Sequence, residues 1–209
     1  MVQKQADARA KRRGRPRSYD PHTALGQVIE SFWKTGYSGT SLDVISASTG
    51  MNRPSLYAGF GDKQALYLKS LDHYWNKSFA AMREALRYDI PVDEALMAVY
   101  DKALAIYFSG NDGPRGCFAI GTAATESVEN PEIRAAFASG LRTLDEGFEE
   151  RIRAACNSGE LKSNADPATL AMLASATLHT IAIRARAGTP RPTLRKLARN
   201  AVELLCEKR

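Results

Sequence analysis

Apolar residues recur along most of the chain at intervals of three and four, which is the spacing of one face of an α-helix. Alternation with a period of two, which is typical of β-strands, is scarce. The pattern therefore predicts an all-α fold. In the larger part of the chain, we expect helices near residues 92–109, 117–128, 131–157, 167–187 and 191–207.

The first part of the chain predicts a helix after Pro21, since proline fits the first turn of a helix. Lys34 and Gly36 are expected to close this helix. The apolar stripe on its inner face consists of Leu25, Val28, Ile29 and Phe32.

Two short helices are predicted next. Thr40 is expected to cap the first, which ends at Gly50, and Asn52 is expected to cap the second, with Pro54 in its first turn. Asp62 is then expected to cap a long helix. Two short helices joined by a tight glycine-containing turn, after a longer helix, form the layout of a helix-turn-helix.

The charge is distributed unevenly along the 209 residues. Residues 1–17 hold seven Lys and Arg against one Asp, and this accounts for the whole net charge of +6. Residues 81–209 hold 17 of each sign. A polar segment this basic indicates either a solubilising tail or an arm that binds a polyanion, of which nucleic acid is the usual one.

The chain shows few signs of other chemistry. Its three cysteines are odd in number and widely spaced, so we expect a reducing, cytoplasmic location and no metal site or cofactor. The most apolar stretch, residues 167–183, is short and contains polar residues, so no membrane association is expected. Phosphate-binding loops, nucleophile elbows and zinc-binding helix motifs are absent from the sequence, so an enzyme is not expected.

Residues 21–70 resemble the DNA-binding domain of the tetracycline-repressor (TetR) family. The resemblance lies in the segments 32–37 (FWKTGY), 40–42 (TSL), 50–57 (GMNRPSLY) and 60–66 (FGDKQAL). It implies an all-helical homodimer that binds a double-stranded DNA operator and releases it when a small molecule enters the C-terminal domain.

We therefore divide the chain into an arm resembling an AT-hook, residues 1–19, a helix-turn-helix DNA-binding domain, residues 20–66, and a helical effector-binding and dimerisation domain, residues 67–209. The predicted helix at residues 167–187 is apolar on nearly every side. Because such a helix must be buried all round, we expect it and the helix at residues 191–207 to form the dimer interface.

The resemblance also implies which residues contact DNA. Arg53, Pro54 and Ser55 would begin the recognition helix and reach base edges, with Arg53 donating to guanine. Phosphate contacts are implied for Thr40, Ser41, Tyr57 and Lys63. The alternatives are that Tyr57 is a core aromatic residue and that Lys63 is a solvated helix end.

The sequence departs from the family pattern in the recognition helix. Pro54 stands where the family often has a glycine or an equally small residue, and Ala58 and Gly59 stand where a bulky pair is common. These changes reduce the contacts expected from this helix. We expect the arm to supply affinity instead, with Arg13, Arg15 and Arg17 in the minor groove of A·T-rich DNA.

Seven residues of the middle helices are candidates for effector contacts. Cys117 is expected to start a helix near Arg115, an environment that would stabilise a reactive thiolate, although a core role is the alternative. Cys156 and Cys206 are expected in the core. The full set of candidates is Tyr100, Tyr107, Cys117, Phe118, Thr122, Phe137 and His179.

These observations predict a ligand-responsive transcriptional repressor that acts as a homodimer on a palindromic operator. A transcriptional activator is an open alternative, since the position of the operator decides between the two. A second alternative is an architectural DNA-binding protein, which would use the arm and would need neither a ligand nor an internal pocket.

Overall fold

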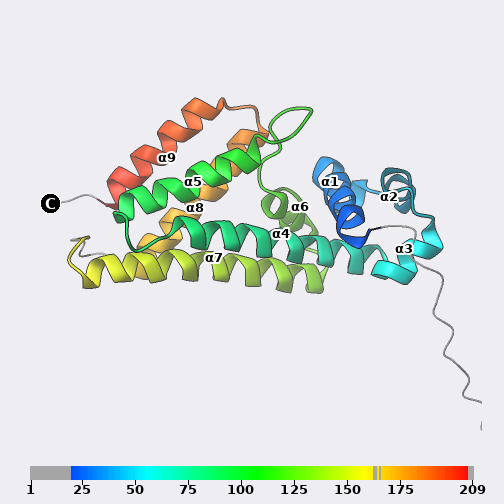
Figure 1. Ribbon diagram of the computed structural model, residues 1–209, viewed down its shortest axis with the longest axis horizontal. Helices are drawn as coiled ribbons and strands as arrows, with labels where there is room; N and C mark the ends of the chain where they lie inside the picture. The colour runs from blue at the N-terminus through cyan, green and yellow to red at the C-terminus, as the bar shows by residue number, and fades with distance from the viewer. Residues whose placement is uncertain (1–19, 162–163, 165, 207–209) are drawn as a thin grey trace, which may run out of the picture.

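The computed structural model describes residues 20–161, 164 and 166–206. Over this part of the chain the fold consists of α-helices with no β-strand, which confirms the all-α prediction (Figure 1). The helices are α1 (Pro21–Gly39), α2 (Leu42–Thr49), α3 (Arg53–Phe60), α4 (Lys63–Ala85), α5 (Val92–Tyr107), α6 (Phe118–Glu126), α7 (Pro131–Asn157), α8 (Pro167–Arg186) and α9 (Arg191–Leu205).

Helices α1, α2 and α3 form a small unit at one end of α4 (Figure 1). The predicted side-chain caps at the starts of α3 and α4 are present. Asn52 Oδ1 accepts a hydrogen bond from Ser55 N at 2.9 Å, and Asp62 Oδ1 accepts one from Ala65 N at 2.8 Å. Gly36 has a φ of +77°, so regular helix geometry in α1 breaks at the position where the sequence predicts its end.

The prediction that Thr40 caps α2 is wrong by one residue. Ser41 is the cap, and its Oγ accepts a hydrogen bond from Val44 N at 3.3 Å. Thr40 is fully buried, and its hydroxyl donates to the carbonyl of Gly36 at 2.6 Å. The threonine therefore satisfies the open end of α1, which leaves the serine to start α2.

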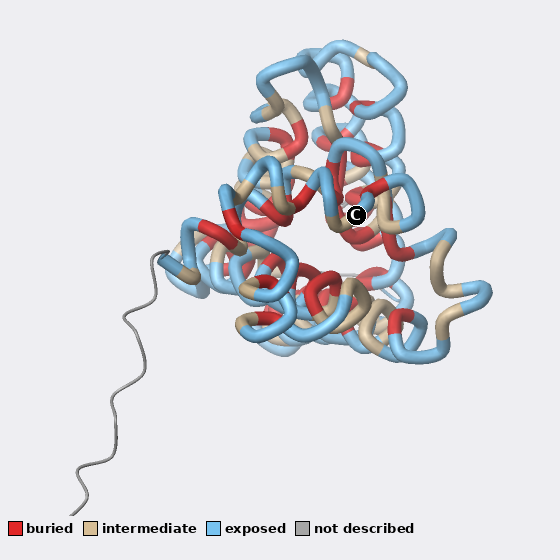
Figure 2. Tube along the Cα trace, turned by 90° about the vertical axis from the view of Figure 1, so that its right-hand side faces the viewer, coloured by how far each residue is buried: buried red, intermediate tan, exposed pale blue. Residues whose placement is uncertain are grey.

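Helices α4 to α9 form the larger body of the protein. Helices α4 and α7 run side by side along its length, α8 packs against α7, and α9 packs against α5 and α8 (Figure 1). Buried positions lie on the helix faces that point toward one another (Figure 2). The predicted boundary between residues 66 and 67 lies within the continuous helix α4, and the division into domains stays a prediction.

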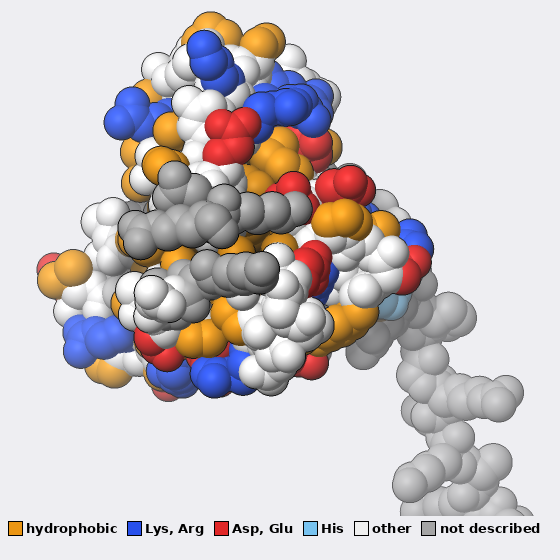
Figure 3. Space-filling view, turned by 90° about the vertical axis from the view of Figure 1, so that its left-hand side faces the viewer, with side chains coloured by type: hydrophobic (Ala, Val, Ile, Leu, Met, Phe, Trp, Pro, Cys, Tyr) orange, Lys and Arg blue, Asp and Glu red, His pale blue; other side chains and the backbone are white. Residues whose placement is uncertain are grey.

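Helix α8 is long and apolar enough to cross a membrane by length and composition. Nearly half of its most apolar window, 44%, is buried inside the protein, as in the core helix of a globular domain. Other apolar side chains of α8 and α9 are exposed, namely Met172, Leu173, Ile183, Leu197 and Leu204. Apolar side chains are also exposed among charged ones at the end of the molecule farthest from α1–α3 (Figure 3).

Candidate nucleic-acid interface and ligand cavity

Helix α3 presents a polar, exposed face on the outside of the small unit. Leu56 and Phe60 are buried, whereas Arg53, Pro54 and Tyr57 are exposed. Tyr57 is 51% exposed, so it is not the core aromatic residue that the alternative required. The exposed face of α3 therefore carries two of the predicted base-reading residues, Arg53 and Pro54, whereas the third, Ser55, is half-buried.

Arg53 is held by an acidic residue of the neighbouring helix. Its Nε donates to Asp43 Oδ1 at 2.9 Å and its Nη2 donates to Asp43 Oδ2 at 2.6 Å. These hydrogen bonds and the charge of Asp43 raise the pKa of Arg53 above its ordinary value. The guanidinium at the start of α3 is thus paired with Asp43 on one side and remains open to solvent.

The predicted phosphate contacts have different outcomes. Ser41 is exposed at the start of α2, where backbone N–H groups favour an anion. Lys63 Nζ lies 4.5 Å from the ring centre of Tyr37, and partial burial lowers the pKa of this lysine. The proposed phosphate contact of Thr40 is contradicted, because its side chain is fully buried and hydrogen-bonded within α1.

The helix-turn-helix unit and the start of α4 carry no net charge. Residues 20–80 contain five Lys and Arg and five Asp and Glu. The basic surplus lies in residues 1–17, and the predicted minor-groove residues Arg13, Arg15 and Arg17 fall outside the described residues. Their role stays a prediction.

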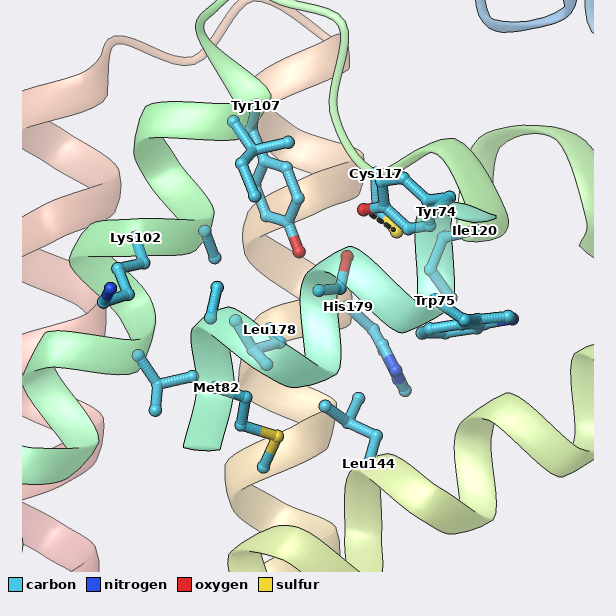
Figure 4. Close-up of a pocket in the computed structure, with 15 residues that line it drawn as sticks. Tyr74, Trp75, Met82, Lys102, Tyr107, Cys117, Ile120, Leu144, Leu178 and His179 are labelled. Atoms are coloured by element: carbon cyan, nitrogen blue, oxygen red, sulfur yellow. Dashed lines mark hydrogen bonds between the residues drawn. The ribbon is translucent and has the colours of Figure 1, made fainter. Parts of the chain in front are cut away.

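An apolar cavity of about 60 Å³ lies within the larger body, between α4, α5, α6, α7 and α8 (Figure 4). Of the seven predicted effector residues, three line it, namely Tyr107, Cys117 and His179. The sequence interpretation missed Tyr74 and Ile120, which also line it. A signal for Tyr74 was present, since Tyr67 and Tyr74 are seven residues apart and share one face of α4.

The other four predicted effector residues lie elsewhere in the core. Tyr100 is buried, and its hydroxyl donates to the carbonyl of Ala174 at 3.0 Å. Thr122 is buried with its hydroxyl 2.7 Å from that of Tyr67. Phe118 is buried in an aromatic cluster, and Phe137 is partly buried against the core. These four side chains pack or hydrogen-bond within the protein, and none of them lines the cavity.

Cys117 differs from the reactive thiolate that the sequence suggested. It does precede α6, but it is buried, and the Tyr74 hydroxyl donates a hydrogen bond to its Sγ at 3.1 Å. Burial raises the pKa of this thiol. The guanidinium of Arg115 contacts Trp33, 3.7 Å from the ring centre, and pairs with Glu30. Burial therefore outweighs the effect of the helix N-terminus.

The other two cysteines differ in exposure. Cys206 is buried, as predicted, whereas Cys156 is only half-buried. The core prediction is thus confirmed for Cys206 and is only partly met for Cys156.

His179 lies beside Leu144 and Met82 at the lower side of the cavity (Figure 4). Its Nε2 is buried, with no hydrogen-bond partner among the described residues. Burial lowers the pKa of this imidazole, so its neutral form is favoured. It is a polar group within an otherwise apolar lining, as in many sites for small molecules.

Helix α6 connects the cavity to the helix-turn-helix unit. Cys117 and Ile120 line the cavity at the start of α6. At its other end, the Glu126 carboxylate accepts hydrogen bonds from the hydroxyl of Ser38 at 2.9 Å and from its backbone N at 3.3 Å. Ser38 lies in the last turn of α1, beyond the kink at Gly36 and three residues before Ser41, the cap of α2.

A helix-turn-helix with an exposed second short helix, joined to a helical body that contains an apolar cavity, defines a class of DNA-binding transcriptional regulators. Residues 28–69 match the family model "Bacterial regulatory proteins, tetR family". Residues 93–202 match the model "Tetracyclin repressor-like, C-terminal domain". The chain therefore belongs to the TetR family, which confirms the resemblance seen in its sequence.

Known proteins support this assignment. The chain is 31% identical over 195 residues to the HTH-type transcriptional repressor ComR of Escherichia coli, covering 93% of this chain and 92% of ComR. It is 35% identical over 107 residues to the repressor BdcR of Escherichia coli, covering 51% and 54% of the two chains. A cysteine-substituted TetR family regulator CifR, solved with 26-bp double-strand operator DNA, matches with a TM-score of 0.83 and 29% identity over 91% of this chain and 98% of that chain.

Proposed function

We propose that this protein is a homodimeric repressor, located in the cytoplasm, that leaves a palindromic operator when a small, neutral, largely apolar molecule enters the cavity. The observation that carries the proposal is the dual contact of α6. Its start lines the cavity, and its last residue, Glu126, is hydrogen-bonded to Ser38 in the last turn of α1, which precedes α2 in the helix-turn-helix unit.

The chemistry of the cavity supports this class of ligand. Its lining is mainly aromatic and aliphatic, and its polar groups include the hydroxyls of Tyr74 and Tyr107. Lys102, which also contributes to the lining, is paired with Glu84 at 2.9 Å. Because an unpaired charge is costly to bury, we expect a neutral molecule that can hydrogen-bond to a hydroxyl.

The exposed apolar residues of α8 and α9 support the homodimer. Met172, Leu173, Ile183 and Leu204 are between 53% and 77% exposed. Apolar side chains gathered on two adjacent helices are typical of a protein interface. A twofold dimer would carry two copies of α3, which matches the two half-sites of a palindromic operator.

Repression is favoured over the two alternatives. ComR and BdcR are named as repressors, and the CifR structure holds operator DNA. An architectural DNA-binding protein would need neither a cavity nor a helix that links the cavity to the end of α1. An activator would use the same contacts, so the position of the operator relative to the promoter distinguishes it.

The proposal can be tested by filling the cavity. Ala103 of α5 lines the cavity, whereas Ala105 of the same helix is exposed. We expect Ala103→Phe to occupy the space of the ligand, while Ala105→Phe serves as the matched control. Binding to DNA upstream of the protein's own gene would be followed by fluorescence anisotropy, with a panel of small neutral aromatic and aliphatic compounds.

We expect compounds in the panel to release the wild type and Ala105→Phe. Ala103→Phe should bind the DNA but resist release. Equal release of both variants by the same compound would contradict a role for this cavity.

A further inference from the structure

The pair between Asp43 and Arg53 joins the two helices of the helix-turn-helix at its outer surface. Asp43 lies in the first turn of α2, and Arg53 is the first residue of α3. The two side chains are 73% and 55% exposed. Because an exposed ion pair adds little to stability, the consequence of this pair is in how it orients the arginine.

The geometry leaves part of the guanidinium free. Asp43 occupies Nε and one hydrogen of Nη2, which form one side of the planar group. The outer edge, with Nη1 and the second hydrogen of Nη2, takes no part in this pair. That edge can donate two parallel hydrogen bonds, which is the arrangement that matches O6 and N7 of guanine.

We infer that Asp43 is a positioning residue that presents Arg53 to guanine and thereby sets the base specificity of the operator. This inference rests on the proposed DNA-binding function. A free arginine side chain has many rotamers and can turn toward a phosphate, which carries no sequence information. The carboxylate restricts Arg53 to an orientation that leaves its outer edge available to a base.

The charge of Asp43 has a second effect. It neutralises Arg53 within a region, residues 20–80, that already holds five charges of each sign. The carboxylate also repels nearby phosphates. Asp43 should therefore lower affinity for DNA of any sequence while it raises discrimination at one base pair of each half-site. A residue that merely supported the fold would not separate these two effects, since its replacement would weaken both.

The test uses the full chain and an operator selected in vitro by the wild type from random duplexes. The variants are Asp43→Asn, Arg53→Ala and the double substitution. Asp89→Asn is the matched control, since Asp89 is an exposed carboxylate that pairs with Nε and Nη2 of Arg87 outside the helix-turn-helix. Each variant is titrated with the operator, with an unrelated duplex, and with operators in which single guanines are replaced by 7-deazaguanine.

For the wild type, we expect removal of the N7 acceptor of one guanine to weaken binding by roughly 5- to 150-fold. Asp43→Asn should reduce this penalty to a few-fold and strengthen binding to the unrelated duplex. In the Arg53→Ala background, the Asp43 substitution should have no further effect on discrimination. Asp89→Asn should behave as the wild type, and thermal melting should show that all variants are folded.

Full guanine discrimination in a folded Asp43→Asn variant would overturn the inference. So would a uniform gain in affinity for all duplexes with the discrimination ratio unchanged, because Asp43 would then only compete with DNA for Arg53. Failure of the wild type to prefer any sequence would instead overturn the proposed function. These two failures are therefore distinguishable.

Discussion

The guanidinium of Arg115 lies against the indole of Trp33, with its central carbon 3.7 Å from the ring centre. Its Nη1 also donates to both carboxylate oxygens of Glu30, at 2.7 and 2.6 Å. Arg115 precedes the cavity residue Cys117 by two positions, and Trp33 and Glu30 belong to α1. The helix-turn-helix unit and the body that contains the cavity therefore meet at Arg115.

Arg115→Ala should destabilise the junction between α1 and the body. We expect the free energy of unfolding to fall by about 1–2 kcal/mol, since the substitution removes both a cation–π interaction and a partly buried ion pair. Urea denaturation measures the change. Lys34→Ala is the control, because Lys34 pairs with Asp112 at the same junction but both side chains are largely exposed. Its cost should stay within about 0.5 kcal/mol, and equal costs would contradict the importance of Arg115.

The close approach of α7 to α4 depends on Gly140. A Cβ placed there would lie 2.2 Å from Cε2 of the buried Trp75. Overpacking of this kind costs about 1–3 kcal/mol, so Gly140→Ala should lower the melting temperature despite the better helix propensity of alanine. Gly26 of α1 is the control, because a Cβ at that position would meet nothing within 4 Å. Gly26→Ala should therefore stabilise by about 0.5–1 kcal/mol. A stabilising Gly140→Ala would show that the helices can separate.

Cys117 should react slowly with alkylating reagents. Burial blocks access and raises the pKa of the thiol, so the thiolate becomes abundant only at a pH above the ordinary range for cysteine. We expect its modification by iodoacetamide at pH 8, followed by mass spectrometry, to be roughly tenfold or more slower than that of the half-buried Cys156. The difference should vanish in urea. Faster modification of Cys117 in the folded protein would restore the reactive-thiol hypothesis.

His179 should make stability dependent on pH. Burial lowers its pKa in the folded state below the ordinary value of 6.5, so the unfolded chain binds the proton more readily. The free energy of unfolding should therefore fall as the pH drops below about 6.5 and level off below the folded-state pKa. His179→Gln should flatten this dependence, whereas His73→Gln, at an exposed position of α4, should preserve it. If the free energy of unfolding depended on pH in the same way in both variants, His179 would not be the source of this dependence.

Local sequence signals predicted the helices well, whereas long-range packing decided the site. Prolines, capping residues and glycines lie next in sequence to the helix ends that they define. The predicted range 131–157 therefore agrees with the observed bounds of α7. The error at Thr40 arose because two adjacent hydroxyl residues can each cap a helix. The contact of Arg115 with Trp33 joins residues 82 positions apart and left no local signal. The pKa of Cys117 was misjudged for the same reason, since burial depends on tertiary packing.

The arm should dominate the electrostatic part of DNA binding. Residues 1–17 carry the whole net charge of +6, while residues 20–80 are balanced. Deleting residues 1–17 should weaken operator binding strongly and make the plot of log K against log salt shallower by roughly 0.9 for each phosphate that the arm no longer neutralises. Replacing Arg13, Arg15 and Arg17 with alanine should give part of the same change. Anisotropy titrations over a range of salt concentrations measure the slope. An unchanged slope after the deletion would show that the arm is a solubilising tail and that α3 and its neighbours supply the affinity alone.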